Sequence, residues 1–268
     1  MLTFAKTAMQ AIAAALIIFL GWPAAAHADS TSIPCRVKAE LVRLAQPLPR
    51  VSLKLASGQP LTIVAVGSSS TAGAGASKPE LNYPNRLQAE LAARFPRQKI
   101  TVINRGTNGE EIGDMLRRFD SAVIAERPDL VLWQLGTNSV LRDHPINDRG
   151  AGIREGLGKI RQIGADVVLI DPQFAPKVIA KPQAETMVQL IGMTAKAENV
   201  DLFHRYDVMK NWRDGDKIKF ESFVSPDGLH MNDWSYGCLA KSLAAAIVEA
   251  ATRPIAAASI SIPAYDPF

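Results

Sequence analysis

The stretch from Leu61 to Gly73, LTIVAVGSSSTAG, carries the main signal of the fold. It starts as an apolar run rich in β-branched residues, and Gly67 ends this run before three serines and a threonine. A run that is apolar at nearly every position predicts a strand buried on both faces, as in a parallel sheet. Ligands of open α/β sheets bind just beyond the carboxyl ends of such strands. The serines therefore either contribute to a site or only cap the next helix.

Four further apolar segments follow, and amphipathic segments separate them. We expect strands over 61–66, 100–103, 130–135, 167–170 and 200–203, and helices over 83–95, 112–126, 151–163, 182–197 and 233–252. Strands that alternate with amphipathic helices form βαβ units and a parallel sheet. We predict an α/β fold, a three-layer α/β/α sandwich around a central, mostly five-stranded parallel sheet in the flavodoxin-like order 2-1-3-4-5. A (β/α)8 barrel needs more units than this chain supplies.

The N-terminal segment, residues 1–28, is typical of a secretory signal peptide. Lys6 is basic, residues 8–22 are almost wholly apolar, and Ala26-His27-Ala28 has the small-x-small pattern of a cleavage site. We predict cleavage before Asp29 and a periplasmic or secreted protein without stable membrane insertion. An uncleaved membrane anchor is the alternative, although the apolar run is short for a full span.

The remaining chain divides into three parts. We expect an N-terminal arm over residues 29–60 with a helix over 37–46, a main domain over 61–254, and a C-terminal tail over 255–268. The only two cysteines are Cys35 in the arm and Cys238 in the last predicted helix. In an oxidising compartment these two cysteines can pair, and a disulfide between them would tie the arm to the domain.

Charge and composition exclude several functions. The formal net charge is +4 and no basic cluster is present, so nothing indicates nucleic-acid binding. No group of His, Cys and Asp residues has the spacing of metal ligands, and we expect no metal and no other cofactor. Gly73-Ala74-Gly75 is not followed by the Gly-Lys-Ser/Thr of a phosphate-binding loop.

Polar segments lie where the predicted strands end. They are 67–71 (GSSST), 104–109 (NRGTNG) and 136–139 (GTNS) after the first three strands, and 225–230 (SPDGLH) before the last helix. Because ligands bind at this edge of a parallel sheet, we expect the four segments to meet there.

A serine hydroxyl needs a base to act as a nucleophile, and histidine is the usual one. Of the four histidines, His27 leaves with the signal peptide, His144 lies in a polar loop, and His204 is followed by an arginine. His230 remains, with Asp227 three residues before it. The carboxylate can hold the imidazole Nδ1–H and leave Nε2 facing the serine. The alternative is that Asp227 only caps a helix.

Acyl transfer also needs hydrogen-bond donors for the oxyanion. The N–H group after a sharp turn, the N–H group of a glycine and the side-chain amide of an asparagine serve in this way. Gly106 and Asn138 each stand at a strand end and are candidates for two of these donors. Each is otherwise an ordinary loop residue.

Together the four segments resemble those of the SGNH, or GDSL-like, esterase and lipase family, from Leu61 to the last helix. The resemblance implies that Ser69 in GSSST is the nucleophile, with Ser68 and Ser70 as alternatives in the same run. It implies the following site residues: Asp227 and His230 in DGLH as acid and base, and the oxyanion hole from Ser69, Gly106 and Asn138.

The chain departs from the family pattern at two positions. Ser68 stands where the family usually has an aspartate before the nucleophile, and Ser139 stands where the third segment often ends in aspartate. Neither departure removes a member of the proposed machinery.

An α/β-hydrolase is the nearest alternative among catalytic folds, but the GxSxG motif of its nucleophile turn is absent after Gly67.

We therefore expect a serine esterase that hydrolyses a small acyl ester, such as acetyl, on a carbohydrate or envelope glycan. The alternatives are a lipid or thioester hydrolase and an acyltransferase that uses the same triad. A non-catalytic glycan-binding domain that keeps the fold is a further alternative from another functional class.

Overall fold

The computed structural model describes residues 33–146 and 149–254 of the 268-residue chain. The chain divides into two compact units, Met1–Pro34 and Cys35–Phe268, and the description below concerns the second. The predicted signal peptide, its cleavage site and the predicted tail lie outside the described residues. Within the described ranges, no helix is long and apolar enough to cross a membrane.

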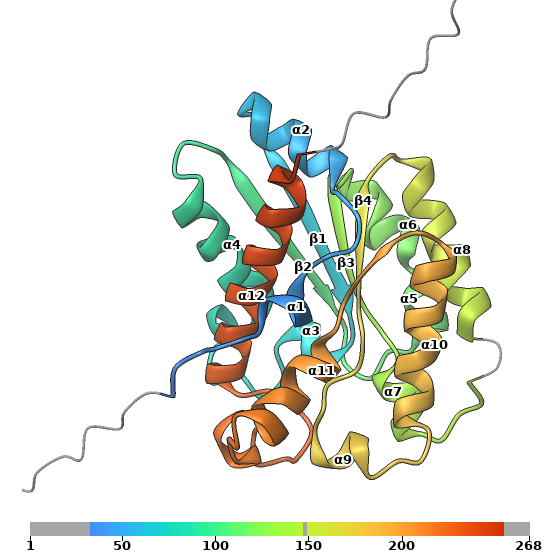
Figure 1. Cartoon of the computed structure of the whole chain (residues 1–268). Coiled ribbons are helices and arrows are strands. Elements are labelled where there is room, and N and C mark those ends of the chain that lie inside the picture. Colours follow the sequence, from blue (N-terminus) through green and yellow to red (C-terminus); the bar gives the residue numbers. More distant parts are fainter. Residues whose placement is uncertain (1–32, 147–148, 255–268) are drawn as a thin grey trace, which may run out of the picture. The chain divides into compact units, whose positions relative to one another are not determined.

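A parallel five-stranded sheet forms the centre of this unit (Figure 1). The strands are β1 (Leu61–Gly67), β2 (Ile100–Gly106), β3 (Leu130–Gln134), β4 (Asp166–Ile170) and β5 (Asp201–Phe203). Their order is β2-β1-β3-β4-β5, and every neighbouring pair is parallel. The predicted fold class and strand order are thus confirmed. β3 is buried along its whole length, as its apolar sequence predicts.

Helices cover both faces of the sheet (Figure 1). They are α1 (Ala39–Val42), α2 (Pro49–Ser57), α3 (Ser69–Ala72), α4 (Tyr83–Arg94), α5 (Ile112–Arg117), α6 (Phe119–Ala122), α7 (Thr137–Leu141), α8 (Arg149–Gln162), α9 (Pro176–Ile179), α10 (Ala184–Ala197), α11 (Arg205–Lys210) and α12 (Asp233–Thr252). α4 and α12 pack together on one face, and α5, α8 and α10 form the layer on the other. The arrangement is the predicted three-layer sandwich.

Two helix predictions differ from the structure. The helix predicted over 112–126 is divided into α5, α6 and a 3-10 turn, because Arg118 leaves helical backbone geometry at φ −110° and ψ 5°. The arm holds only the four-residue α1 where a longer helix was predicted, and α2 and the short helices α3, α7, α9 and α11 were not predicted. Pro49 and Gly58 explain α2: proline suits the first turn of a helix, and Gly58 ends the helix in the left-handed conformation (φ +64°).

The arm from Cys35 onward belongs to the same compact unit as the sheet. Leu44, Leu48 and Val51 are buried in the common core. Two aspartates at the amino-terminal ends of strands hold its backbone. The Asp201 carboxylate accepts the Gln46 N–H at 2.8 Å, and the Asp166 carboxylate accepts the Val51 N–H at 2.9 Å. The arm therefore closes the sheet edge opposite to the polar segments.

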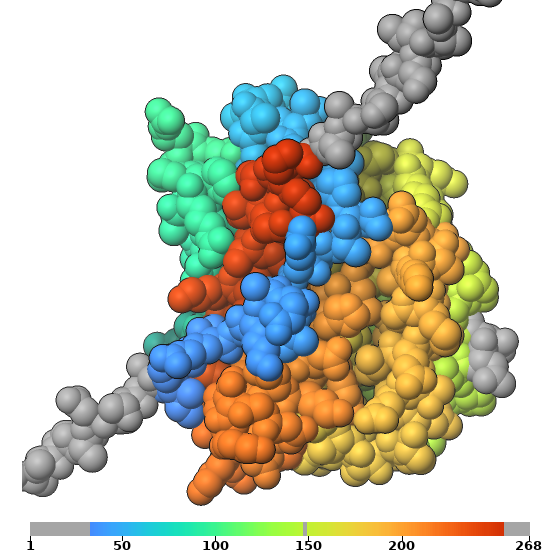
Figure 2. Space-filling model, in the orientation of Figure 1, coloured from blue at the N-terminus to red at the C-terminus, as the bar shows by residue number. Residues whose placement is uncertain are grey.

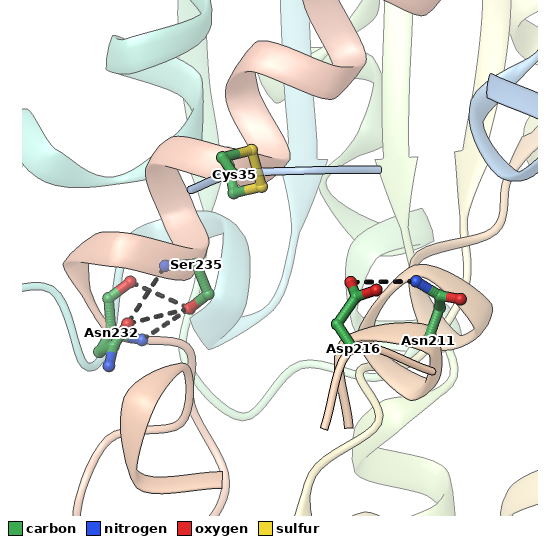
Figure 3. Close-up of a disulfide and its surroundings, with 6 residues drawn as sticks. Cys35, Asn211, Asp216, Asn232 and Ser235 are labelled. Carbon is green, nitrogen blue, oxygen red and sulfur yellow. Dashed lines mark hydrogen bonds between the residues drawn. A yellow bond between two sulfur atoms is a disulfide. The ribbon is translucent and has the colours of Figure 1, made fainter. Parts of the chain in front are cut away.

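A disulfide between Cys35 and Cys238 joins the start of the arm to α12 (Figure 3). Figure 2 shows the N-terminal segment lying over α12 and over the chain that follows β5. At the start of α12, Asn232 and Ser235 form a reciprocal cap, in which each side chain accepts the other residue's backbone N–H. The helix is thus fixed at its amino end, only two residues after His230.

Candidate active site

The nucleophile turn, which we define as residues 67–73, connects β1 to α3. Ser68 is the N-cap of α3, and Gly73 ends that helix with φ +108°. Ser68 and Ser70 are each only 1% exposed, whereas Ser69 is half-buried. Ser69 is thus the one serine of the three that is partly exposed.

His230 lies across the sheet edge from this turn. Its Nε2 is 2.8 Å from Ser69 Oγ, and its Nδ1 is 2.5 Å from Asp227 Oδ2. Ser69, His230 and Asp227 thus form one chain of hydrogen bonds. The structure places these three predicted site residues together, although 161 positions separate Ser69 from His230 in the sequence.

Asp227 is fixed by more than the histidine. Its Oδ1 accepts hydrogen bonds from the Ser225 hydroxyl at 2.7 Å and from the backbone N–H groups of Leu229 and His230 at 2.9 Å. Partial burial opposes ionisation of Asp227, but the hydrogen bonds from the His230 side chain and backbone, Ser225 and Leu229 outweigh it. They hold the pKa of this carboxyl well below its usual range. Asp227 is therefore an anion at neutral pH, able to orient the imidazole.

Asn138, in the first turn of α7, reaches the same edge of the sheet. Its Nδ2 donates one hydrogen bond to the Glu110 carbonyl at 2.8 Å. An amide nitrogen carries two hydrogens, so a second donor remains on this nitrogen. Ser69 is the first residue of α3, and within the described residues its N–H donates to no protein acceptor. First-turn N–H groups of a helix are free in this way.

The N–H of Gly106, which we predict as an oxyanion donor, is bonded to a neighbouring side chain. Gly106 ends β2, and its N–H donates to the Asn104 side chain at 2.9 Å. A Cβ at this position would come within 2.1 Å of the Ala72 backbone nitrogen, so glycine allows close approach of β2 to the nucleophile turn. The prediction that Gly106 serves the oxyanion therefore requires its bond to Asn104 to open.

Gly109, which the sequence reasoning did not select, is the other glycine of the segment after β2. Its φ is +78°, and its N–H has no acceptor within the described part of the chain. The Gly109 carbonyl accepts a hydrogen bond from Arg142 at 2.8 Å. The next residue is Glu110, whose carbonyl holds Asn138. The available sequence signal was a second glycine at the end of the polar segment 104–109 (NRGTNG).

Glu111 links the loop after β2 to α7. It is 8% exposed, and its carboxylate lies 2.8 Å from Ser139 Oγ, 2.8 Å from Arg142 Nη1 and 2.8 Å from His144 Nδ1. Burial opposes its ionisation, but hydrogen bonds from Arg142, Ser139 and His144 and the charge of Arg149 lower its pKa to about 2. Glu111, ionised at neutral pH, thus holds the helix that carries Asn138.

The two described histidines that the sequence analysis did not select contact other carboxylates. His144 contacts Glu111, and His204 Nδ1 is 3.8 Å from the Asp207 carboxylate. In the ranges that the structure describes, no group of three or more His, Cys, Asp or Glu side chains is arranged to hold a metal ion.

A cavity of about 300 Å³ lies beside the loop that carries Asp227. Pro176, Phe220 and Val224 form apolar walls, and Ser225 and Asn232 supply polar groups. Phe220 stacks on Phe174 with ring centroids 5.8 Å apart. This cavity adjoins the loop that carries Asp227, whereas a larger one of about 530 Å³ lies between α1 and α12 and contains none of the predicted site residues.

The chain belongs to the Non-GDSL lipase-like family, whose family model matches residues 34–253. This finding confirms the resemblance to GDSL-like hydrolases that the four segments predict. The family assignment covers the arm from Pro34 as well as the sheet and α12.

Individual relatives show lower similarity. An arylesterase of Vibrio mimicus is 28% identical over 123 residues, which are 46% of this chain and 60% of the arylesterase. An acetylxylan esterase of Geobacillus stearothermophilus is 25% identical over 156 residues, 51% of this chain and 70% of that protein. The structure of a two-domain esterase active on acetylated mannans superposes with a TM-score of 0.68 at 23% identity, over 86% of this chain and 60% of that one. The match thus spans less than two thirds of the arylesterase and of the two-domain esterase.

Proposed function

We propose that this protein is a serine esterase that removes small acyl groups from carbohydrate esters. The observation that carries the proposal is the hydrogen-bonded chain from Ser69 Oγ to His230 Nε2, and from His230 Nδ1 to the ionised Asp227. Nucleophile, base and orienting acid are the parts that acyl transfer through a serine requires.

In the proposed reaction, His230 Nε2 accepts the Ser69 hydroxyl proton while Oγ bonds to the acyl carbonyl carbon. The imidazolium then gives this proton to the departing alkoxide as the ester bond breaks, which leaves an acyl-serine and a free alcohol. Water then attacks the acyl-serine while His230 takes a proton from it, and His230 returns this proton to Ser69 Oγ as the acyl–Oγ bond breaks and the carboxylic acid leaves. Asp227 keeps Nδ1 protonated, so that Nε2 is free to accept.

The oxyanion of each tetrahedral intermediate needs donors near Ser69. We propose the Ser69 N–H and the second hydrogen of Asn138 Nδ2, since neither is bonded to another group among the described residues. Gly106 is the donor that we predict from the sequence, and Gly109 is the alternative, because the Gly106 N–H is already bonded to Asn104.

For the substrate, we propose an acetyl ester on a glycan. The acetylxylan esterase and the esterase active on acetylated mannans among the similar proteins support this class. The cavity beside the catalytic loop supports it too, because it presents the aromatic ring of Phe220 together with polar groups. Lipid or thioester hydrolysis and acyl transfer remain the competing uses of the same residues.

The predicted location is the periplasm or the outside of the cell. The Cys35–Cys238 disulfide supports this proposal, because such bonds persist in oxidising compartments.

Labelling with a fluorophosphonate probe tests the proposed chemistry. Wild-type protein should be labelled, Ser69→Ala should not, and Ser70→Ala should keep the label. A wild-type protein that takes no label, or label that persists in Ser69→Ala, would contradict the proposal.

A substrate panel then tests the acyl group and the alcohol. We expect acetyl esters to be hydrolysed faster than long-chain esters, and acetylated xylo- or manno-oligosaccharides to release acetate. Faster hydrolysis of long-chain esters would favour the lipid alternative, and transfer of the acyl group to an added alcohol in place of water would favour the acyltransferase.

A further inference from the structure

Gln134 is a polar residue at the end of the otherwise apolar strand β3, and it is fully buried. Its side-chain oxygen Oε1 accepts the Ser68 N–H at 2.9 Å, the Ser68 hydroxyl at 3.0 Å and the Thr71 hydroxyl at 3.3 Å. All these donors belong to the nucleophile turn, on either side of Ser69. One oxygen atom thus accepts hydrogen bonds from Ser68 and Thr71, on both sides of the partly exposed Ser69.

The orientation of the Gln134 amide follows from these contacts. A backbone N–H can only donate, so the Ser68 N–H requires an oxygen opposite it, and Oε1 rather than Nε2 must face the turn. Nε2 then points elsewhere, and within the described residues it has no hydrogen-bond partner. Buried polar groups are nearly always satisfied, so a buried amide with one end unpaired indicates a requirement at its other end.

The opposite side of the turn is held by β2. Asn104 Nδ2 donates to the Thr71 carbonyl at 2.8 Å, and Gly106 lets the two backbones approach closely. At Gly67, a Cβ would lie 2.8 Å from Gln134 Oε1, so the turn fits closely against the glutamine as well. The nucleophile turn is therefore clamped between β3 and β2, and Gln134 is the β3 half of this clamp.

We propose that Gln134 is a positioning residue, which fixes Ser68 and Thr71 so that the Ser69 hydroxyl stays aimed at His230. This inference rests on the proposed serine chemistry, and Gln134 itself touches neither Ser69 Oγ nor the reacting atoms. Ser68 and Gln134 act as a matched pair. The aspartate that the family usually carries at position 68 would set a carboxylate against Oε1, acceptor against acceptor.

The test compares two Gln134 variants of similar size. Gln134→Met removes the acceptor, and Gln134→Glu keeps an acceptor oxygen facing the turn. We expect Gln134→Met to lower kcat by roughly 10- to 100-fold with KM changed less than about twofold, because a displacement of about 1 Å at a reacting group costs about 100-fold. The rate of fluorophosphonate labelling should fall in parallel. Gln134→Glu should recover more than half of the lost factor on a logarithmic scale.

Leu157→Ala is the control for lost stability, since Leu157 is a fully buried residue of α8 and belongs to neither the turn nor its contacts. At the same loss of Tm, it should keep wild-type kcat. If Gln134→Met does not fold, Thr71→Val and Ser68→Ala, which each remove one hydroxyl donor, replace it and should each lower kcat at unchanged KM.

Two results would overturn the inference: a kcat for Gln134→Met within about threefold of the Leu157→Ala value, or equal loss in the methionine and glutamate variants. A wild-type protein without labelling or esterase activity would instead reject the proposed function, so the two failures are distinguishable.

Discussion

Removing the Cys35–Cys238 disulfide is expected to lower the free energy of unfolding by about 5 kcal/mol, as the loop-closure relation gives for the length of chain it encloses. The two cysteines are 203 positions apart, so the bond closes nearly the whole described chain into one loop. The bond acts mainly on the unfolded chain, whose conformational freedom it reduces. Native domains are stable by only about 5–15 kcal/mol, so this bond would supply a large share.

The folded state should survive the loss of this bond. The arm keeps its own contacts, because Asp201 and Asp166 hold the backbone of Gln46 and Val51, and Arg253 donates to the Leu44 carbonyl at 2.8 Å. We therefore expect the esterase activity at 25 °C to remain near the wild-type value.

The measurement is urea-induced unfolding of the oxidised wild type and of a Cys35→Ser/Cys238→Ser double variant. The expected loss corresponds to a decrease of roughly 10–20 °C in Tm, at about 2–4 °C for each kcal/mol in a domain of this size. The wild type in reducing buffer is the control, and it should match the double variant. A loss below about 1 kcal/mol would refute the reasoning, since the loop would then already be restricted without the bond.

Further outcomes are expected at single sites. Asn138→Ala should lower kcat by roughly 100- to 1000-fold, as removal of one oxyanion donor does in such sites, with circular dichroism unchanged; wild-type kcat would exclude Asn138 from the oxyanion hole. Burial raises the pKa of Asp166 and Asp201 to about 6, against the hydrogen bonds from arm N–H groups. Their raised pKa values mean that the folded state keeps protons which the unfolded chain releases near pH 4, so the unfolding free energy should fall as pH rises from about 4 to about 6. An Asp166→Asn/Asp201→Asn variant should show a flatter profile in urea titrations, and an unchanged slope would contradict this origin. Ser139→Asp, which restores the usual family residue, should destabilise the protein by placing a second carboxylate against Glu111; calorimetry should show a lower Tm, and addition of Glu111→Gln should recover part of it.

Much of the fold was predictable from the sequence because it depends on local patterns. Apolar runs at Leu61, Ile100 and Leu130 predict buried strands, and the glycines and polar residues that follow mark the edge at which the site forms. Topology then brings the strand ends together, and His230 was selected because the other histidines were eliminated by their positions and because Asp227 lies three residues before it. Each of these signals is local, because it lies within a few consecutive residues of the sequence.

The remaining features depend on contacts between distant side chains. The division of the helix predicted over 112–126 occurs where Arg118 turns to bind the Glu110 carboxylate, and no local pattern indicates this ion pair. α2 was missed because Pro49 reads as a helix breaker, although its backbone suits a first turn. The bond between Gly106 and Asn104 is likewise a matter of side-chain geometry, and it decides which backbone N–H is free.

The two departures from the family pattern have the same physical explanation. At positions 68 and 139 the family usually has an aspartate, and this chain has a serine. The acceptor for each serine comes from the end of a different strand. Ser68 donates to Gln134 at the end of β3, and Ser139 donates to Glu111 in the loop after β2. In both cases the serine is the sequence neighbour of a residue of the proposed machinery, Ser69 on α3 or Asn138 on α7. Since a buried donor left unpaired is costly, neither serine can be exchanged without regard to its partner. The sites are thus constrained as pairs, and substitution of one member tests the other.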